Sequence, residues 1–301
     1  MKLSIVIAVN KRDLWFCRIC IASIRYYYPD IPIYLLKDEL NGGFSTREIE
    51  THWKVQVYNL SGKKFGWGAS KTFFLLHAPE NEKFLILDSD IIFIGPFLER
   101  LKDVIQNNDI VISADYMPDP HLAWVKNIYF DVKKLQAHDA EYMYPGYFFN
   151  TGQMIITGGK IRNSDFRGYF SRDYPYWLRK DLLPLVDQSL YNYIFPKLEA
   201  SGKISIGKDH FMIWSESQQA KNITLSDVQE GNIQSGLIHW AGALRSPSLK
   251  KMSGSDLLTF FENYYYHNIP FSFIKRRIRI VMYKFLMVGL KIKSRIHGSL
   301  S

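Results

Sequence analysis

The chain of 301 residues has only two cysteines, Cys17 and Cys20, and both fall in one predicted helix. A zinc or redox role for a C-x-x-C pair needs a second pair of ligands or an exposed loop, and the sequence provides neither. We therefore expect two buried thiols. Internal repeats and low-complexity linkers are also absent, so the sequence predicts one main domain, residues 1–262, followed by a carboxyl-terminal extension, residues 263–301.

Acidic residues are absent after Glu262, where eight basic residues follow. The chain has 38 Lys and Arg against 29 Asp and Glu, a formal net charge of +9. Without the eight tail residues, 30 basic residues face 29 acidic ones, so the main domain is nearly neutral. A broad nucleic-acid-binding face needs Lys and Arg spread over the globular surface. We therefore predict no nucleic-acid partner.

The tail also lacks an apolar run long enough to cross a bilayer, which takes about 20 residues. Its longest apolar stretch, Ile280–Leu290, is short and is interrupted by Lys284. Between Phe273 and Ile296, apolar residues recur at helical spacing and basic residues occupy the remaining surface. We expect an amphipathic helix that lies in the interface of an anionic membrane. A helix packed on the main domain, with a solvated basic face, is the alternative.

The apolar part of residues 1–9 is too short for a secretory signal peptide and leads directly into the first predicted strand. We therefore expect a cytoplasmic protein. With the amphipathic tail, the expected location is peripheral, on the cytoplasmic face of a membrane.

Apolar runs and helical patterns alternate along the chain, which is typical of the opening of a nucleotide-binding α/β domain. The predicted strands are Ser4–Val9, Pro32–Leu36, Gln56–Leu60, Phe84–Leu87 and Ile110–Ala114. The predicted helices are Asp13–Tyr27, Ala69–His77 and Val186–Tyr193. Residues 116–177 are rich in aromatic and turn residues, and we expect irregular loops there. Within them, a polar turn at Asn150–Gly152 is predicted to open a strand that reaches Ile156.

The segment Phe84–Gly95, FLILDSDIIFIG, is apolar except at Asp88-Ser89-Asp90. A strand without polar alternation is typical of the middle of a sheet covered on both faces, where a carboxylate needs a partner. The two aspartates follow its carboxyl end, at the crevice where open α/β sheets bind ligands. Carboxylates and phosphate oxygens are ligands of Mg²⁺ or Mn²⁺, so we interpret the segment as a metal–diphosphate site. A turn that caps a following helix is the alternative.

Three further motifs follow this D-x-D in the chain: Asn150-Thr151-Gly152, Asp187-Gln188-Ser189 and HWAGALR from His239 to Arg245. Together and in this order, the four motifs resemble those of GT-A glycosyltransferases. The resemblance is to family eight, which includes glycogenin and bacterial lipopolysaccharide galactosyl- and glucosyltransferases. It covers roughly Ser4 to Arg245 and implies a single α/β catalytic domain with the GT-A fold, a Rossmann-like fold that binds nucleotide sugars.

The resemblance implies that Asp88, Asp90 and His239 are the ligands of Mn²⁺ or Mg²⁺. His239 would bind as a neutral imidazole, and a packed core histidine is the alternative. Gly242 would let the backbone approach a phosphate, and Arg245 would bind that phosphate. Arg245 stands where the family has lysine, a change that keeps the charge but not the geometry.

The resemblance also implies a set of side chains and backbone groups around a UDP-sugar donor. The donor-binding residues are Ala8, Asn10, Lys71, Asp88, Ser89, Asp115, Asn150, Gly242 and Arg245. Three of them have a structural alternative: Asn10 as a helix cap, Lys71 as a solvated helix lysine, and Asp115 as a strand-end turn residue.

Asp187 and Gln188 are the catalytic residues that the resemblance implies. Gln188 would lie opposite the leaving group and stabilise a cationic sugar, while Asp187 would hold donor hydroxyls. A helix cap is the alternative role of Asp187. The sequence departs from the family at Ser189, where the last carboxylate of a D-Q-D element is expected, and this change affects the sugar-specific contacts.

The predicted function is the metal-dependent transfer of a sugar from a UDP-sugar to a glycan or lipid-linked acceptor, with retention of anomeric configuration. A nucleotidyltransferase is one alternative, because it also places paired carboxylates on a metal and a diphosphate. Such enzymes usually have a glycine-rich loop after the first strand, and residues 8–12 contain no glycine. A non-catalytic membrane-surface module is the other alternative, and it would leave Asp88, Asp90 and His239 without a role.

Overall fold

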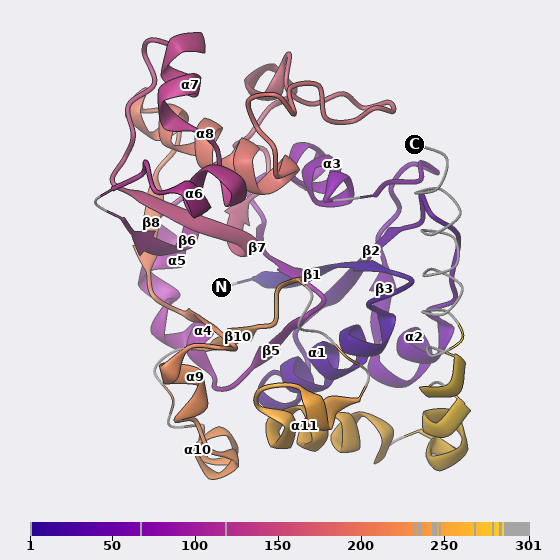
Figure 1. Cartoon of the computed structure of the whole chain (residues 1–301). Coiled ribbons are helices and arrows are strands. Elements are labelled where there is room, and N and C mark those ends of the chain that lie inside the picture. The colour runs from indigo at the N-terminus through magenta and orange to yellow at the C-terminus, as the bar shows by residue number, and fades with distance from the viewer. Residues whose placement is uncertain are drawn as a thin grey trace, which may run out of the picture.

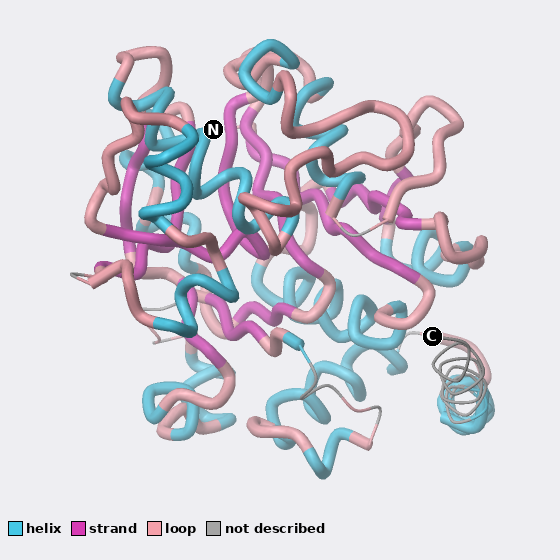
Figure 2. The backbone as a smooth tube through the Cα atoms, turned by 45° about the horizontal axis from the view of Figure 1, so that its top comes forward, coloured by secondary structure: helices cyan, strands magenta, loops and turns pink. Residues whose placement is uncertain are grey.

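A seven-stranded sheet runs through the middle of the molecule, in the order β3-β2-β1-β4-β7-β6-β8. Helices lie on both sides of it (Figure 1, Figure 2). The computed structural model describes residues 2–66, 68–117, 119–231, 233, 236–242, 246, 248–267, 269–278, 280–282 and 285.

The large sheet is mixed, with its parallel strands grouped around β1. Its strands are β1 (Leu3–Asn10), β2 (Ile33–Asp38), β3 (Val55–Val57), β4 (Lys83–Asp88), β6 (Ile110–Tyr116), β7 (Tyr147–Thr157) and β8 (Ile206–Asp209). β1 pairs in parallel with β2 and β4, whereas β7 is antiparallel to both β4 and β6. Phe84–Leu87 of β4 is buried throughout, as its unbroken apolar run predicts.

A second, smaller sheet has three strands of three residues each, β5 (Ile91–Phe93), β10 (Leu237–His239) and β9 (Met212–Trp214). β10 is the middle strand, antiparallel to β5 and parallel to β9. β5 begins directly after Asp90, so this sheet joins the end of the β4 turn to a late part of the chain. It provides the geometric frame of the site described below.

Helices cover both faces of the large sheet (Figure 1). They are α1 (Leu14–Tyr27), α2 (Arg47–Trp53), α3 (Ala69–His77), α4 (Phe97–Arg100), α5 (Lys102–Asn107), α6 (Ala123–Ile128), α7 (Val132–His138), α8 (Val186–Ala200), α9 (Gln218–Lys221), α10 (Leu225–Glu230) and α11 (Ser255–His267). By contrast, α11 packs on α1, α10 on α11 and α9 on β9 of the small sheet. α1 and α11 share one apolar core with the small sheet, and α3 and α8 share another. Cys17 and Cys20 are buried free thiols in α1, as predicted.

The prediction of irregular loops over residues 116–177 is wrong in part, because α6, α7 and β7 lie there. The predicted turn at Asn150–Gly152 is also wrong, since these residues are inside the 11-residue strand β7. The three residues form an irregular stretch of β7, because the register against β6 shifts between Ile112 and Ala114, and the Gly152 amide donates locally to Asn150 Oδ1 at 2.8 Å. Likewise, α8 continues past its predicted end, because it buries Ile194 and Leu198 on either side of Pro196.

The chain is helical again at residues 272–278 and 280–282, after α11. Within the part of the chain that the structure describes, no helix combines the length and apolarity needed to cross a membrane. The predicted domain boundary after Glu262 falls inside α11. Most of the predicted tail, including Lys284, Val288 and Ile292, lies outside the described residues.

Candidate active site

Two aspartates and one histidine meet at the carboxyl end of β4. One ligand atom each of Asp88, Asp90 and His239 lies within 4.8 Å of the others, and His239 Nε2 is 3.2 Å from Asp90 Oδ1. The small sheet brings them together, because His239 of β10 pairs with Ile91 of β5, and the Trp240 amide donates to the Asp90 carbonyl at 3.0 Å. The three predicted ligands therefore form one cluster.

The cluster fits a divalent metal. A Cβ at Gly152 would lie 2.6 Å from His239 Cε1, 2.6 Å from Asn150 Oδ1 and 2.9 Å from Asp88 Oδ2, so a side chain there would fill the space between these groups. His239 is 2% exposed, and its Nδ1 has no hydrogen-bond partner among the described residues. Two carboxylates with one imidazole match the ligand preferences of Mn²⁺, and Mg²⁺ also accepts the carboxylates.

Lys71 of α3 links the metal cluster to the start of α8. Its Nζ is 2.8 Å from Asp88 Oδ1 and 2.8 Å from Asp187 Oδ2, and it donates to the Thr151 carbonyl at 3.3 Å. Burial disfavours its charged form, but the two carboxylates outweigh burial and place the pKa of Lys71 above its ordinary value. The alternative of a solvated helix lysine is therefore wrong, because the side chain is only 4% exposed.

Charged groups of both signs lie around the Asp88 carboxyl. Burial raises the pKa of the Asp88 carboxyl above its ordinary value, and the Lys71 ammonium opposes this shift, while Asp90 adds to it. A carboxylate in such a place is stabilised by a cation, because burial without one disfavours its charged form. The Lys71 ammonium is one such cation. A metal ion bound by Asp88, Asp90 and His239 would be a second one.

Gln188 is held in one orientation by strand β7. Its Oε1 accepts hydrogen bonds from the Thr151 amide at 2.9 Å and from Thr151 Oγ1 at 3.0 Å, and its Nε2 donates to the Phe149 carbonyl at 2.9 Å. Asn150 lies beside it, with Nδ2 3.5 Å from Gln188 Oε1 and Oδ1 accepting from the Gly152 amide at 2.8 Å. The structure thus brings together Asn150, Asp187 and Gln188, as the resemblance implies.

The carboxylate of Asp187 does not cap α8, and it forms the ion pair with Lys71 instead. The helix cap position is Leu185, whose amide donates to Ser189 Oγ at 2.9 Å, so Ser189 rather than Asp187 binds the helix start. The cap alternative for Asp187 is therefore wrong. Val186 has a φ of 40°, which is strained for a β-branched residue, and such strain is common next to functional groups.

Two polar residues of the site escaped the sequence analysis. Asn192 donates to and accepts from the backbone of Phe149, at 2.8 and 2.9 Å, and so clamps α8 to β7. Its spacing of four residues from Gln188 along one helix face was the available signal. Asp38 ends β2 beside Asn10 of β1, and burial raises its pKa to about 6. It was missed because the second strand was predicted to end at Leu36.

The other predicted donor-binding residues lie around this centre. Ala8 pairs with Asp88 across β1 and β4, and Ser89 is buried. Asn10 Oδ1 accepts from the amides of Arg12 and Asp13, at 2.8 and 3.2 Å, so it shapes the turn into α1, close to its alternative role as a helix cap. Their contacts with a donor stay predictions.

Two more of these residues lie at the margin of the described site. Gly242 has a φ of 77°, and no atom of the described residues lies within 4 Å of where a Cβ would be, which suits close approach of a ligand. Asp115 lies near the end of β6, opposite Phe148, and burial raises the pKa of its carboxyl. Arg245 lies outside the described residues.

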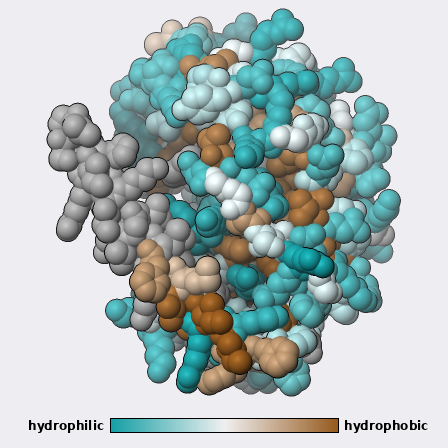
Figure 3. All heavy atoms as spheres, turned by 90° about the vertical axis from the view of Figure 1, so that its right-hand side faces the viewer, coloured by the Kyte–Doolittle hydropathy of each residue, from teal (hydrophilic) through white to brown (hydrophobic). Residues whose placement is uncertain are grey.

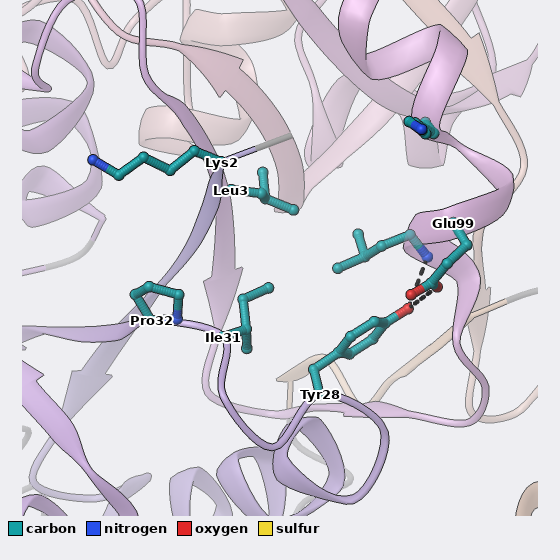
Figure 4. Close-up of a pocket in the computed structure, with 8 residues that line it drawn as sticks. Lys2, Leu3, Tyr28, Ile31, Pro32 and Glu99 are labelled. Atoms are coloured by element: carbon teal, nitrogen blue, oxygen red, sulfur yellow. Dashed lines mark hydrogen bonds between the residues drawn. The ribbon is translucent and has the colours of Figure 1, made fainter.

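A cavity of about 420 Å³ lies elsewhere, near the start of β1 and the turn into β2 (Figure 4). It is lined by Lys2, Leu3, Tyr28, Ile31, Pro32, Leu98, Glu99 and Lys102. Tyr28 donates to Glu99 Oε2 at 2.6 Å and accepts from the Leu98 amide at 3.0 Å, so these polar groups satisfy one another. None of the predicted metal or catalytic residues lines it, and we do not assign it to the active site.

Comparison with solved structures identifies the fold. No protein-family model matches the sequence, and a search of curated proteins gives no match. The structure of the bifunctional glycosyltransferase WbbM superposes with a TM-score of 0.58 at 12% identity, covering 92% of this chain and 51% of WbbM. The galactosyltransferase LgtC, solved with donor and acceptor sugar analogues, gives 0.54 at 19% identity, covering 86% of this chain and 94% of LgtC. The chain has the GT-A glycosyltransferase fold.

This result confirms the predicted fold class. The GT-A domain here spans about half the length of WbbM and nearly all of LgtC. A second LgtC structure, of an active-site variant with Glu in place of Gln, gives a TM-score of 0.52 at 15% identity, with coverages of 86% and 94%. At these identities the likeness establishes the fold, and the chemistry must be argued from the residues of this chain.

Proposed function

We propose that this GT-A protein is a metal-dependent glycosyltransferase that moves a sugar from a nucleotide diphosphate sugar to a glycan or lipid-linked acceptor. One observation carries the proposal: Asp88, Asp90 and His239 form a metal-binding cluster at the carboxyl end of β4, beside the Lys71–Asp187 pair. UDP-sugars are the favoured donors, because the four sequence motifs resemble those of family eight. The LgtC structure with donor and acceptor sugar analogues supports the same class of ligands.

Asp88, Asp90 and His239 would hold Mn²⁺ or Mg²⁺, and such an ion neutralises negative charge on a departing diphosphate. Lys71 and Gly242 would shape the site around the ion and the diphosphate. Lys71 fixes the carboxylates of Asp88 and Asp187 relative to each other, so metal ligand and sugar-binding group keep one spacing. Gly242 has no side chain to keep a diphosphate away from the backbone. No general acid is needed on this side of the reaction, because the leaving group departs as a stabilised anion.

Gln188 favours retention of configuration. Its amide is fixed by Thr151 and Phe149, and a neutral amide is a weak nucleophile compared with a carboxylate. It can instead stabilise positive charge on an oxocarbenium-like sugar while the acceptor hydroxyl attacks from the face of the leaving group. The nucleotidyltransferase alternative is disfavoured, because the turn after β1 is built by the side chain of Asn10 rather than by glycines.

A panel of nucleotide sugars incubated with the protein and Mn²⁺ tests this function. We expect hydrolysis or transfer from one UDP-sugar, loss of activity with EDTA, and recovery on adding Mn²⁺. The ¹H NMR spectrum of the first product formed should show the anomeric configuration of the donor. Release of pyrophosphate from a nucleoside triphosphate and a sugar phosphate would instead identify a nucleotidyltransferase. An inverted anomer would contradict the role given to Gln188 and make Asp187 a candidate base.

We also propose that the protein attaches to the cytoplasmic face of an anionic membrane through the segment after α11. Seven of its described apolar side chains are 51% to 79% exposed: Phe271, Phe273, Ile274, Ile278, Val281, Met282 and Phe285. The space-filling view of this side shows apolar side chains gathered at its lower left (Figure 3). Isolated exposed apolar residues are ordinary, whereas a run of this kind indicates an interaction surface.

Two of the three described basic residues of the segment, Lys275 and Arg276, turn toward the main domain, which neither sequence alternative anticipated. Arg276 forms an ion pair with Glu262 of α11 and donates to Asn263 Oδ1 at 2.9 Å. Lys275 Nζ is 3.9 Å from Glu48 of α2, and Arg277 lies 4.2 Å from the centroid of the Phe273 ring. Lys275 and Arg276 thus fasten the helix to the domain, whereas Arg277 and the apolar side chains are exposed.

The composition of the chain after Glu262 favours an anionic lipid surface as the partner of these exposed apolar side chains. Its basic residues are Lys275, Arg276, Arg277, Arg279, Lys284, Lys291, Lys293 and Arg295, and acidic residues are absent. Each cation near an anionic membrane contributes about 1 kcal/mol, and exposed Phe and Ile side chains add burial in the acyl boundary. A membrane-bound glycosyltransferase of this kind is suited to a lipid-linked acceptor.

Co-sedimentation with vesicles of phosphatidylglycerol and phosphatidylcholine tests the attachment. We expect the full chain to bind, and the double variant Ile274→Asp, Ile278→Asp to lose at least about tenfold in affinity, because two exposed apolar anchors become charged. Met143→Asp is the matched control, since Met143 is 81% exposed but lies outside the segment. Equal vesicle binding by the double variant, or concentration-dependent dimerisation that disappears in it, would contradict membrane attachment.

A further inference from the structure

Trp214 presents a large aromatic ring at the edge of the metal cluster. It is the last residue of β9 and pairs with His239 of β10, and its ring stacks on the imidazole with centroids 5.4 Å apart and an interplanar angle of 20°. His239 is 2% exposed, whereas Trp214 is 37% exposed. One part of the indole therefore packs on a metal ligand and the rest faces solvent beside it.

The backbone holds this ring in a fixed place. The Trp214 carbonyl accepts from the Ser217 amide at 3.0 Å, and the next amide, that of Ser215, donates to the His239 carbonyl at 3.1 Å. Met212 and Ile213, the other residues of β9, are buried. A rigidly placed indole with an open surface loses little conformational entropy when a ligand packs on it, which is why aromatic residues are frequent in binding sites.

The ring lies on the side of the cluster away from the expected nucleoside position. Asn10 and Asp38 end β1 and β2, on one side of β4, whereas β9 follows β8 at the opposite edge of the large sheet. The Met212 amide donates to Ser113 Oγ of β6 at 3.3 Å, which ties β9 to that edge. In Figure 1, β8 and β10 lie left of the centre and β2 and β3 lie on the right.

Polar groups accompany the ring on this side. β6 and β8 run in parallel with Ser113 opposite Asp209; Asp115 lies two residues further along β6, and His210 directly follows β8. Asp115 is partly buried and His210 is exposed. The Met212–Ser113 hydrogen bond ties β9, which ends at Trp214, to the same end of β6. A carboxylate and an imidazole on the same side as an aromatic surface are suited to hydroxyl groups on one face and C–H groups on another, which is the surface of a pyranose ring.

We propose that Trp214 is the platform of the acceptor subsite, on which the apolar face of an acceptor sugar stacks. Asp115 and His210 then bond hydroxyls of that sugar. The proposal rests on the proposed glycosyl transfer and deepens it, because it assigns the acceptor end to a pyranose rather than to a protein hydroxyl or a simple alcohol. The face of the indole carries partial negative charge, so it attracts the polarised C–H groups of a sugar ring.

Two substitutions separate the aromatic platform from support of the metal ligand. Trp214→Leu keeps apolar packing on the imidazole but removes the aromatic face, whereas Trp214→Phe keeps a ring. Binding of methyl glycosides of common hexoses and hexosamines is measured by saturation-transfer NMR, with UDP and diamagnetic Mg²⁺ present. We expect Trp214→Leu to weaken glycoside binding by about tenfold or more, the scale of losing one stacked ring, and Trp214→Phe to stay within about threefold of wild type.

A Mn²⁺ titration of the same proteins gives the second readout. We expect both variants to bind Mn²⁺ within about twofold of wild type, because neither removes a ligand. Trp124→Leu is the matched control, since Trp124 is 47% exposed and lies in α6. Wild-type glycoside binding by Trp214→Leu, no glycoside binding by wild type, or a parallel loss of Mn²⁺ in both Trp214 variants would each overturn the subsite. Failure of the proposed function appears separately, as an absence of Mn²⁺-dependent turnover of every nucleotide sugar.

Discussion

Replacing Asp90 by Asn should reduce Mn²⁺-dependent turnover of the nucleotide sugar by at least about a hundredfold, the scale for losing one group that stabilises developing charge. Asp90 is 5% exposed and faces His239 Nε2, and Asn keeps its volume while removing its negative charge. The fold should therefore survive while metal affinity falls. His239→Ala should act in the same direction, because it removes the ligand contributed by β10. Turnover measured across a Mn²⁺ titration checks both.

Asp119→Asn is the control for the loss of one negative charge. Asp119 is exposed, and its Oδ1 accepts a hydrogen bond from the His121 amide that an asparagine can also accept. We expect wild-type turnover and an unchanged melting temperature from this variant, and a far-UV circular dichroism spectrum like that of the wild type from the two site variants. If Asp90→Asn or His239→Ala kept wild-type turnover at limiting Mn²⁺, the metal assignment would be wrong.

Gly152→Ala should be almost as damaging, although it adds a single methyl group. The new Cβ would lie 2.6 Å from His239 Cε1 and 2.9 Å from Asp88 Oδ2, distances at which one of the groups must move. The backbone cannot easily give way, because the Gly152 amide donates to Asn150 Oδ1 at 2.8 Å and the Thr151 amide donates to Gln188 Oε1 at 2.9 Å. We expect at least about a tenfold loss of Mn²⁺ affinity, as for disturbed neighbours of metal ligands, and a corresponding loss of turnover.

Gly43→Ala is the matched control for this substitution. Its added Cβ would meet only Glu39 Oε1, at 3.5 Å, which is an ordinary contact. Isothermal titration with Mn²⁺ and circular dichroism of both variants separate loss of the site from loss of the fold. Wild-type Mn²⁺ affinity in Gly152→Ala would show that the space beside His239 is not where the ion binds.

The sequence predicted the strand ends that carry the carboxylates because strong local signals coincided there. The unbroken apolar run before Asp88 indicated a strand buried on both faces, and the helix at Ala69–His77 was predicted with its observed bounds. The role of Lys71 was harder to predict, since burial of one helix face by α8 depends on tertiary packing. Only the structure shows that its ammonium lies between Asp88 and Asp187.

The sequence could not predict the parts that depend on distant pairing. β5, β9 and β10 are three residues long, too short for a periodic pattern, and their partners lie far apart in the chain. His239 was therefore identified by resemblance alone, and Trp214 was not singled out. Asn150–Gly152 has the composition of a turn, and the structure makes it an irregular stretch inside β7, between the residues that pair with β6 on either side of a register shift.

The small sheet has a consequence for stability as well as for chemistry. β5 and β10 are held by few backbone hydrogen bonds, yet they join residues that follow Asp90 to residues that precede Trp240. An ion that binds Asp88, Asp90 and His239 only when this sheet is closed favours the closed state by mass action, by about 2.7 kcal/mol at a free concentration one hundred times its dissociation constant. The concentration of divalent cations would then set the fraction of molecules in which β10, from the last third of the chain, is paired with β5, from the first third, before any sugar is transferred.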